Sequence, residues 1–177
     1  LMAPHASYLA VNISSPNTPG LRALQDDGAL TALLDAVIEA RAAAGLESVP
    51  PIFLKVAPDL EPSDIDAITR IAIDKRLGAL MVSNTTISRP ALRSSHADEA
   101  GGLSGAPLSQ LALNRLRDFR QSSGSEIPLV GIGGISNAEE AWERIRAGAS
   151  LVQLYSALVY EGPGLGARIV RGLQRLM

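Results

Sequence analysis

Neutral hydrogen-bonding side chains gather in one short segment near the start of the chain, VNISSPNTPG at residues 11–20. The segment contains two asparagines, two serines and a threonine, but no acid, histidine or cysteine. Such groups can orient a polar ligand, yet a serine hydroxyl at its ordinary pKa is a poor base. Any proton transfer here must therefore depend on how the hydroxyl is positioned and on where the proton can go.

Four further segments show the same change from apolar to polar residues. They are LKVAPD (54–59), VSNTT (82–86), GIGGIS (131–136) and QLYSA (153–157). Asn, Ser, Thr and Gly are also ordinary turn formers, so any single segment has a purely structural explanation. Because five segments share neutral donors and acceptors, and one carries a lysine, we favour a common polar site.

Lys55 lies inside the apolar segment IFLKVAP, residues 52–58. An ammonium group there must either extend to solvent or face an anion, since burying it unpaired is costly. The apolar residues on both sides favour an inward position. We expect Lys55 to neutralise a carboxylate, a phosphate or a reduced flavin.

The segment 127–149 is rich in glycine, and Gly131, Gly133 and Gly134 allow the backbone to approach a ligand closely. Ser136 and Glu139 match an S-x-x-E capping box at the start of the next helix, whose amide groups could face a phosphate. A tight turn with an ordinary cap is the alternative. We favour phosphate binding, with the side chains of residues 155 and 156 beside it.

The segment VSNTTISRP, residues 82–90, places amide and hydroxyl groups directly after an apolar run. They suit the binding of a planar polar ligand, although an Asx or ST turn is the alternative. The long polar loop 89–105 that follows is typical of a lid or binding loop. His96 in this loop and His5 have no partners at metal-ligand spacing, so we expect no metal site.

The elements that must position these residues alternate strictly between strand and helix. Apolar runs rich in β-branched residues indicate five buried strands, at 8–13, 51–57, 79–84, 128–134 and 151–157. Helical spacing is seen at 29–45, 63–78, 108–124, 137–148 and 164–177, and the first four helices end on glycines suited to C-caps. We interpret the charged residues of the fourth helix, Arg144 among them, as solvated surface.

This alternation fits either a doubly wound open sheet or part of a (β/α)8 barrel, and in both folds ligands bind at the carboxyl ends of the strands.

Apolar residues make up 46% of the chain and charged residues 19%, as in an ordinary soluble domain. The net charge of −2 without a basic tract argues against nucleic acid as a partner, and the absence of cysteine excludes thiol chemistry. No apolar run approaches the roughly 18 residues of a membrane span, so we expect this chain to be soluble. It begins at Leu1 and enters a strand at once, so we also expect coding sequence upstream.

Six segments in order closely resemble the class 2, quinone-linked dihydroorotate dehydrogenases, from about Tyr8 to Pro163. The segments are VNISSPNTPGLRALQ, LKVAPDL, SNTTISRP, GGLSGAPL, GIGGISNAEEA and IRAGASLVQLYSALVYEGP. The resemblance implies an α/β fold, a TIM (β/α)8 barrel that binds FMN, of which residues 1–177 supply about strands four to eight of a single domain. It also implies oxidation of dihydroorotate to orotate in pyrimidine biosynthesis.

The resemblance further implies a role for individual residues. Ser15 corresponds to the base that takes a proton from C5 of dihydroorotate while hydride leaves C6 for the flavin, and Thr18 corresponds to its proton relay. The related class 1 enzymes have a cysteine in place of this serine. The substrate would be bound by Asn12, Asn17, Asn84 and Thr85. FMN would be bound by Asn12, Lys55, Ser83, Gly105, Gly134, Tyr155 and Ser156, with Ser83 replacing an expected threonine. Ser14 matches the motif without a role in proton transfer.

Parts of the family's structure have no counterpart in this chain, namely its membrane-associating N-terminal helices, its quinone tunnel and its first three strands. We expect the full-length protein to lie on a membrane surface, on the cytoplasmic face of a bacterial inner membrane, and to meet quinone through that other region. We expect the 177-residue chain alone to be inactive and poorly folded. Two alternatives remain: another FMN-barrel reductase acting on a dihydropyrimidine or dihydrouridine, and a half-barrel that serves as a binding or assembly module.

Overall fold

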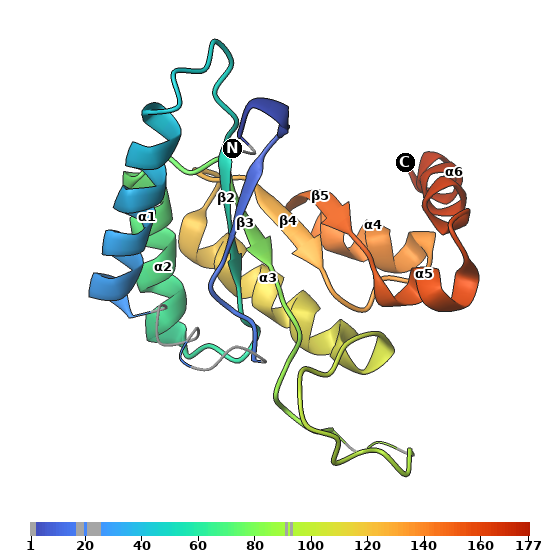
Figure 1. Ribbon diagram of the computed structural model, residues 1–177. Helices are drawn as coiled ribbons and strands as arrows, with labels where there is room; N and C mark the ends of the chain where they lie inside the picture. Colours follow the sequence, from blue (N-terminus) through green and yellow to red (C-terminus); the bar gives the residue numbers. More distant parts are fainter. Residues whose placement is uncertain (1–2, 17–19, 21–25, 91, 93) are drawn as a thin grey trace.

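The strands form one parallel sheet, with helices between them (Figure 1). The computed structural model describes residues 3–16, 20, 26–90, 92 and 94–177. The strands pair in chain order and are β1 (Leu9–Asn12), β2 (Ile52–Val56), β3 (Ala79–Val82), β4 (Leu129–Ile132) and β5 (Ala149–Gln153). The helices are α1 (Asp27–Ala42), α2 (Pro62–Asp74), α3 (Ser109–Ser123), α4 (Ala138–Arg146), α5 (Ser156–Glu161) and α6 (Leu165–Leu176). Short 3-10 turns η1 (Ala3–His5) and η3 (Ala106–Leu108) complete the described elements.

The two faces of the sheet have different neighbours. In β2, Ile52, Leu54 and Val56 are buried in the main core, together with apolar side chains of α1, α2 and α3. Phe53 packs instead with a small cluster on the other side, made of Ala79, Met81, Val130 and Ile132. Successive side chains of a strand point to opposite faces, so Lys55 shares the side of Phe53. We call this side the inner face.

All five predicted strands are present, with changes at their ends. The fifth begins at Ala149, two residues earlier than predicted, and ends at Gln153, so Tyr155 and Ser156 follow it. The prediction that all five strands are buried is wrong for β1 and β5, whose residues are mostly half-buried or exposed. Each is an edge strand of the described sheet and pairs with one neighbour only, which leaves its other side uncovered.

The predicted glycine C-caps are partly wrong. Gly124 ends α3 with a φ of 56°, as expected. Helix α2 instead ends at Asp74, and Arg76 adopts the left-handed conformation (φ 53°). Gly78 serves close packing, because a Cβ there would lie 2.6 Å from the Cβ of Pro51. Helix α5 was not predicted, since its six residues are too few to show a period.

The capping box predicted for α4 is wrong, and the N-cap lies one residue later than predicted. Asn137 is the N-cap, and its side chain accepts a hydrogen bond from the backbone N–H of Glu140 (2.8 Å). The Glu140 carboxylate accepts from the Ser136 N–H (2.7 Å) and hydroxyl (2.8 Å). The pairing of Ser136 with Glu139 is therefore wrong, because Asn137 has an extended backbone and its side chain caps the first turn instead.

Candidate active site

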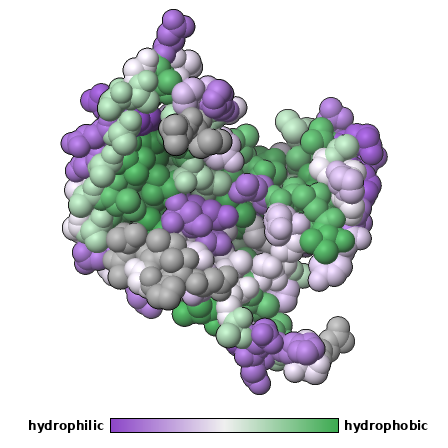
Figure 2. All heavy atoms as spheres, in the orientation of Figure 1, coloured by the Kyte–Doolittle hydropathy of each residue, from purple (hydrophilic) through white to green (hydrophobic). Residues whose placement is uncertain are grey.

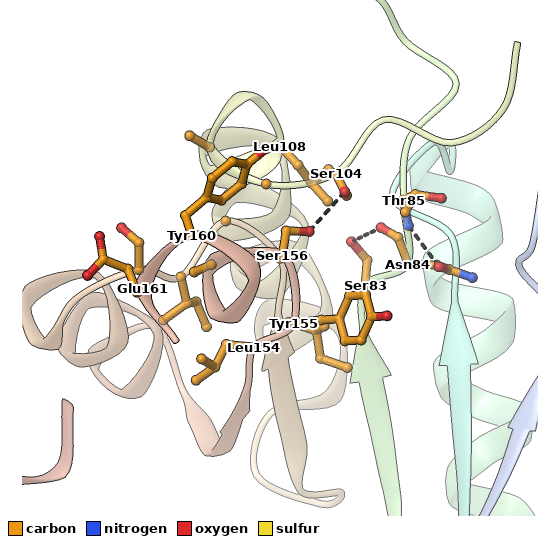
Figure 3. A pocket seen from close by; sticks show the side chains of 18 of the residues that line it. Ser83, Asn84, Thr85, Ser104, Leu108, Leu154, Tyr155, Ser156, Tyr160 and Glu161 are labelled. Carbon is orange, nitrogen blue, oxygen red and sulfur yellow. Dashed lines mark hydrogen bonds between the residues drawn. The ribbon is translucent and has the colours of Figure 1, made fainter. Parts of the chain in front are cut away.

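A cavity of about 390 Å³ lies at the carboxyl ends of β2 to β5 (Figure 3). This is the end at which ligands bind in parallel α/β sheets. The cavity brings together most of the predicted site residues: Lys55, Ser83, Asn84, Thr85, Gly105, Gly134, Tyr155 and Ser156. Residues separated by up to about a hundred positions in the sequence thus share one site.

Lys55 contributes a half-buried cation to the cavity wall. It pairs in register with Asn12 of β1 and with Met81 of β3, on the inner face. Burial lowers the pKa of its ammonium group. Among the described residues no hydrogen bond or ion pair to this ammonium is found. The group is therefore suited to an anionic partner in the cavity.

Asn84 connects the cavity to the first strand through Ser14. Its Nδ2 donates to the Ser14 hydroxyl (3.0 Å) and to Oδ1 of Asn12 (3.3 Å). The Ser14 hydroxyl in turn donates to the same Asn12 oxygen (2.8 Å), and Ser14 is fully buried. Asn84 Oδ1 accepts from the Thr85 N–H (2.9 Å). These bonds fix the orientation of the Asn12 and Asn84 side chains, two of the three asparagines predicted to bind substrate. This role of Ser14 was not indicated by its motif alone.

The predicted catalytic residues lie beside this network in the chain. Ser15 directly follows Ser14 and is half-buried, and it does not belong to the described cavity wall. Asn17 and Thr18 lie outside the described residues.

The loop between β3 and η3 is anchored at its base. Thr86 and Leu103 form an antiparallel bridge across it. Asp59, which follows β2, accepts hydrogen bonds from the Thr86 hydroxyl, the Ile87 N–H (3.1 Å) and the Ser88 hydroxyl (3.2 Å). The expected binding loop thus has a carboxylate at its base, next to the residues that enter the cavity.

The guanidinium of Arg89 joins the two sides of the same loop. It donates to the carbonyls of Glu99 (2.9 Å) and Gly101 (2.6 Å), and to the carbonyl of Ile87 on its own side (3.2 Å).

The far end of the loop returns to the cavity at Gly105, whose φ of 77° favours glycine. Just before it, Ser104 accepts a hydrogen bond from the Ser156 hydroxyl (2.9 Å), and Figure 3 shows the two side chains pointing toward one another. Ser104, Tyr160 and Glu161 line the cavity but were not predicted. The last two belong to α5, the helix that the sequence pattern did not reveal.

The glycine segment after β4 forms a close-packed part of the wall. Gly133 and Gly134 have φ values of 106° and 65°. A Cβ on Gly134 would lie 2.6 Å from the backbone nitrogen of Ser109, the first residue of α3. The N–H of Ser136 is taken by Glu140, so it is not available to a phosphate as expected. The Gly134 N–H has no hydrogen-bond partner among the residues that the structure describes.

Arg144 contradicts the interpretation of the α4 charges as solvated surface, because its side chain is fully buried. Ala138, Ala141 and Arg144 follow one another at i, i+3 spacing and are the buried residues of this helix. That spacing was the available signal, since it puts the arginine on the apolar side of α4.

In the described part of the chain, no helix is both long enough and apolar enough to cross a membrane.

Comparison with known proteins gives one consistent match. The family model "Dihydroorotate dehydrogenase" matches residues 1–177. The chain is 73% identical to dihydroorotate dehydrogenase (quinone) of Novosphingobium aromaticivorans over 99% of this chain and 49% of that protein. It is 74% identical to the protein of the same name from Erythrobacter litoralis, over 98% of this chain and 50% of that protein. The chain thus spans about half the length of the curated relatives it matches.

Solved structures of the same family also match this chain. The crystal structure of dihydroorotate dehydrogenase from Eimeria tenella in complex with ferulenol matches with a TM-score of 0.91 and 34% identity, over 98% of this chain and 51% of that one. The expected fold class, part of a TIM barrel, is confirmed by this match and by the parallel sheet. The family model and the relatives lead to one conclusion: the chain belongs to the dihydroorotate dehydrogenase family.

Proposed function

We propose that the full-length protein containing this chain oxidises dihydroorotate to orotate at a bound FMN, in pyrimidine biosynthesis. The observation that carries the proposal is that Lys55, Asn84 and Gly134, from three separate strand ends, line one cavity. The family match supports the same reaction.

The cavity residues suit a flavin with a phosphate. The volume of about 390 Å³ falls in the range of small-molecule sites. Gly105 and Gly134 have positive φ values at the wall, and the Gly134 N–H, which has no partner among the described residues, is a donor for an anion. Tyr155 and Ser156 line the same cavity. Lys55 would lie by the flavin ring, and Ser83 and Asn12 would also contact the cofactor. When bound, FMN supplies the acceptor for the substrate hydride.

The polar residues would orient the substrate and move its proton. Asn84 and Thr85, together with Asn12 and Asn17, would hydrogen-bond the pyrimidine ring and its carboxylate. The hydroxyl Oγ of Ser15 would accept the proton from C5, and Thr18 would pass it on. A hydroxyl with an ordinary pKa can do this only if it is held against the C–H bond, which is the role of the ordered segment around Ser14.

Quinone is the proposed electron acceptor, because the curated relatives are named for it. Quinones are apolar, so the full-length protein would work at a membrane surface, on the cytoplasmic face of a bacterial inner membrane. That contact would be made by residues outside this chain.

We also propose that the 177-residue chain, domain-sized but open, does not turn over substrate alone. Apolar side chains are exposed on its C-terminal side, where Figure 2 shows hydrophobic residues at the surface over α5 and α6. Val159 is 74% exposed and Val170 56% exposed. An open sheet with such surface is prone to association.

The test is a quinone-reduction assay with purified full-length protein, with HPLC identification of the released flavin. We expect FMN, and activity with dihydroorotate. Activity with dihydrouracil or dihydrouridine instead would favour the alternative reductase. Absence of flavin and of activity in well-folded protein would overturn the proposal. The isolated chain is assayed in parallel and is expected to be inactive.

A further inference from the structure

Arg144 is a buried cation directly behind the glycine part of the cavity wall. Its side chain is fully buried, at 0% exposure. Within the described residues it forms no salt bridge, and burial lowers its pKa despite the nearby carboxylates of Glu143 and Glu140, which raise it. A buried guanidinium without a carboxylate partner is costly to keep. The cost of burying the Arg144 guanidinium must therefore be offset by other polar or charged groups.

The hydrogen bonds of Arg144 lead to the cavity wall. Its Nη2 donates to the carbonyl of Gly133 (3.0 Å), and to the carbonyl (2.8 Å) and hydroxyl (3.0 Å) of Ser109. Its Nε and Nη1 have no hydrogen-bond partner in the part of the chain that the structure describes. One side chain thus ties the β4 loop to the first residue of α3.

The bond from Arg144 to the Gly133 carbonyl sets the orientation of the peptide unit that joins Gly133 and Gly134. In a planar trans peptide the C=O and the following N–H point in opposite directions. Because the Gly133 carbonyl faces Arg144, the Gly134 N–H faces away from it, toward the cavity that both glycines line. That N–H has no partner among the described residues. The negative end of the Gly133 carbonyl therefore points away from the cavity, and the Gly134 N–H is the group that a ligand would meet.

Helix α3 adds to the same effect. Its first residue, Ser109, packs against Gly134, so the positive end of the helix dipole lies close to the Arg144 charge. Both favour negative charge at this part of the wall. The structure has no carboxylate bonded to either group among the described residues.

We infer that Arg144 is a positioning residue for the phosphate end of the flavin, holding the Gly133–Gly134 peptide in its anion-binding orientation and supplying positive potential from behind. The inference rests on the proposed flavin site. According to this inference, Arg144 favours the binding of FMN over riboflavin, which has the same ring system without the phosphate. The flavin ring itself would be bound by other residues.

The experiment measures flavin selectivity in the full-length protein. The protein is equilibrated with FMN and riboflavin together, and the bound flavins are quantified by HPLC after gel filtration. Arg144→Met is expected to lower the bound FMN-to-riboflavin ratio by roughly 10- to 100-fold, the scale of a hydrogen bond to a charged group. Arg144→Lys, which keeps the charge, should stay within a few-fold of the original ratio. Arg146→Met, an exposed arginine on the same helix, is the matched control and should not change it.

The flavin ratios of the variants distinguish a role of Arg144 in phosphate binding from a merely structural role. If Arg144→Met binds both flavins less tightly by the same factor, or keeps the original ratio, Arg144 is merely structural and the inference is wrong. If Arg144→Met does not fold, Arg144→Gln and Arg144→Lys decide, since the inference requires the neutral variant to lose selectivity and the charged one to keep it. Should neither neutral variant fold, loss of FMN selectivity in Arg144→Lys would overturn it, and retained selectivity would support it. Failure of the original protein to bind either flavin would instead refute the proposed flavin site.

Discussion

The side-chain amide of Asn84 lies 3.0 Å from the hydroxyl of Ser14, although the two residues follow β3 and β1 and the whole of β2 lies between those strands. Both also contact Oδ1 of Asn12. The orientation of two asparagines at the proposed substrate site therefore depends on one buried serine.

Ser14→Ala should weaken this arrangement without abolishing the fold. It leaves the Asn12 oxygen and the Asn84 amide each short of a partner, which costs about 1–3 kcal/mol. In full-length protein we expect kcat/KM for dihydroorotate to fall by at least about tenfold, while FMN content stays unchanged. Ser7→Ala, at an exposed position before β1, is the control. Unchanged kinetics in Ser14→Ala would show that the network does not hold the substrate amides.

Asp59→Asn should loosen the loop that follows β3. An amide replaces the carboxylate that accepts hydrogen bonds from the Ile87 N–H and the Ser88 hydroxyl. We expect faster hydrogen exchange of peptides covering 86–90, and a KM raised several-fold. Asp66→Asn removes a comparable acceptor on α2, where it bonds the Ser122 hydroxyl at 2.6 Å, and should leave that exchange unchanged. Equal exchange in both variants would contradict the anchoring role.

Gly134→Ala should damage the phosphate end of the site. Its φ of 65° is unfavourable for alanine, and the added Cβ would press on the start of α3. Strain and overpacking together predict a loss of about 2–4 kcal/mol in the free energy of unfolding, measured with denaturant. Gly166→Ala lies in α6 with open space around it and should be neutral or stabilising by up to about 1 kcal/mol. A Gly134→Ala protein as stable as the Gly166→Ala protein would show that the wall is not close-packed.

Lys55 should give the flavin-free protein a stability that rises with alkaline pH. Because burial lowers the pKa of Lys55 in the folded state, the unfolded chain holds this proton to higher pH. The free energy of unfolding therefore increases as the pH rises from the folded pKa to the ordinary value, and the burial penalty is fully present below the folded pKa. An anion beside Lys55 would raise its pKa and reduce this slope.

Denaturant unfolding of the full-length protein at several alkaline pH values measures this effect. The difference in free energy between the original protein and Lys55→Met should vary with pH in the flavin-free form, and less so with FMN bound. A pH-independent difference in the flavin-free form would contradict the burial of a charged lysine.

The strands were accessible from the sequence because buried parallel strands are continuous apolar runs, as in PIFLKVA and ALMVSN. Their order was not, since the alternation also fits a doubly wound sheet, and only the family resemblance implied a barrel. The shared cavity followed, since every such strand ends at the same rim. What the sequence did not reveal depends on tertiary neighbours. Gly78 resembled a helix cap until its contact with Pro51 was known. Arg144 resembled a surface charge, although its spacing from Ala141 placed it on the buried side of α4.

The assignment of the Ser15 hydroxyl as the catalytic base is the central claim, and stopped-flow measurement of flavin reduction by dihydroorotate tests it most directly. In full-length Ser15→Ala with its full complement of FMN, we predict a reduction rate at least about 100-fold below that of the original protein, the scale of general base catalysis. Dihydroorotate should still bind with an affinity within a few-fold, because the asparagines remain. A Ser15→Ala protein whose flavin is reduced within a few-fold of the original rate would contradict the assignment of this hydroxyl as the base.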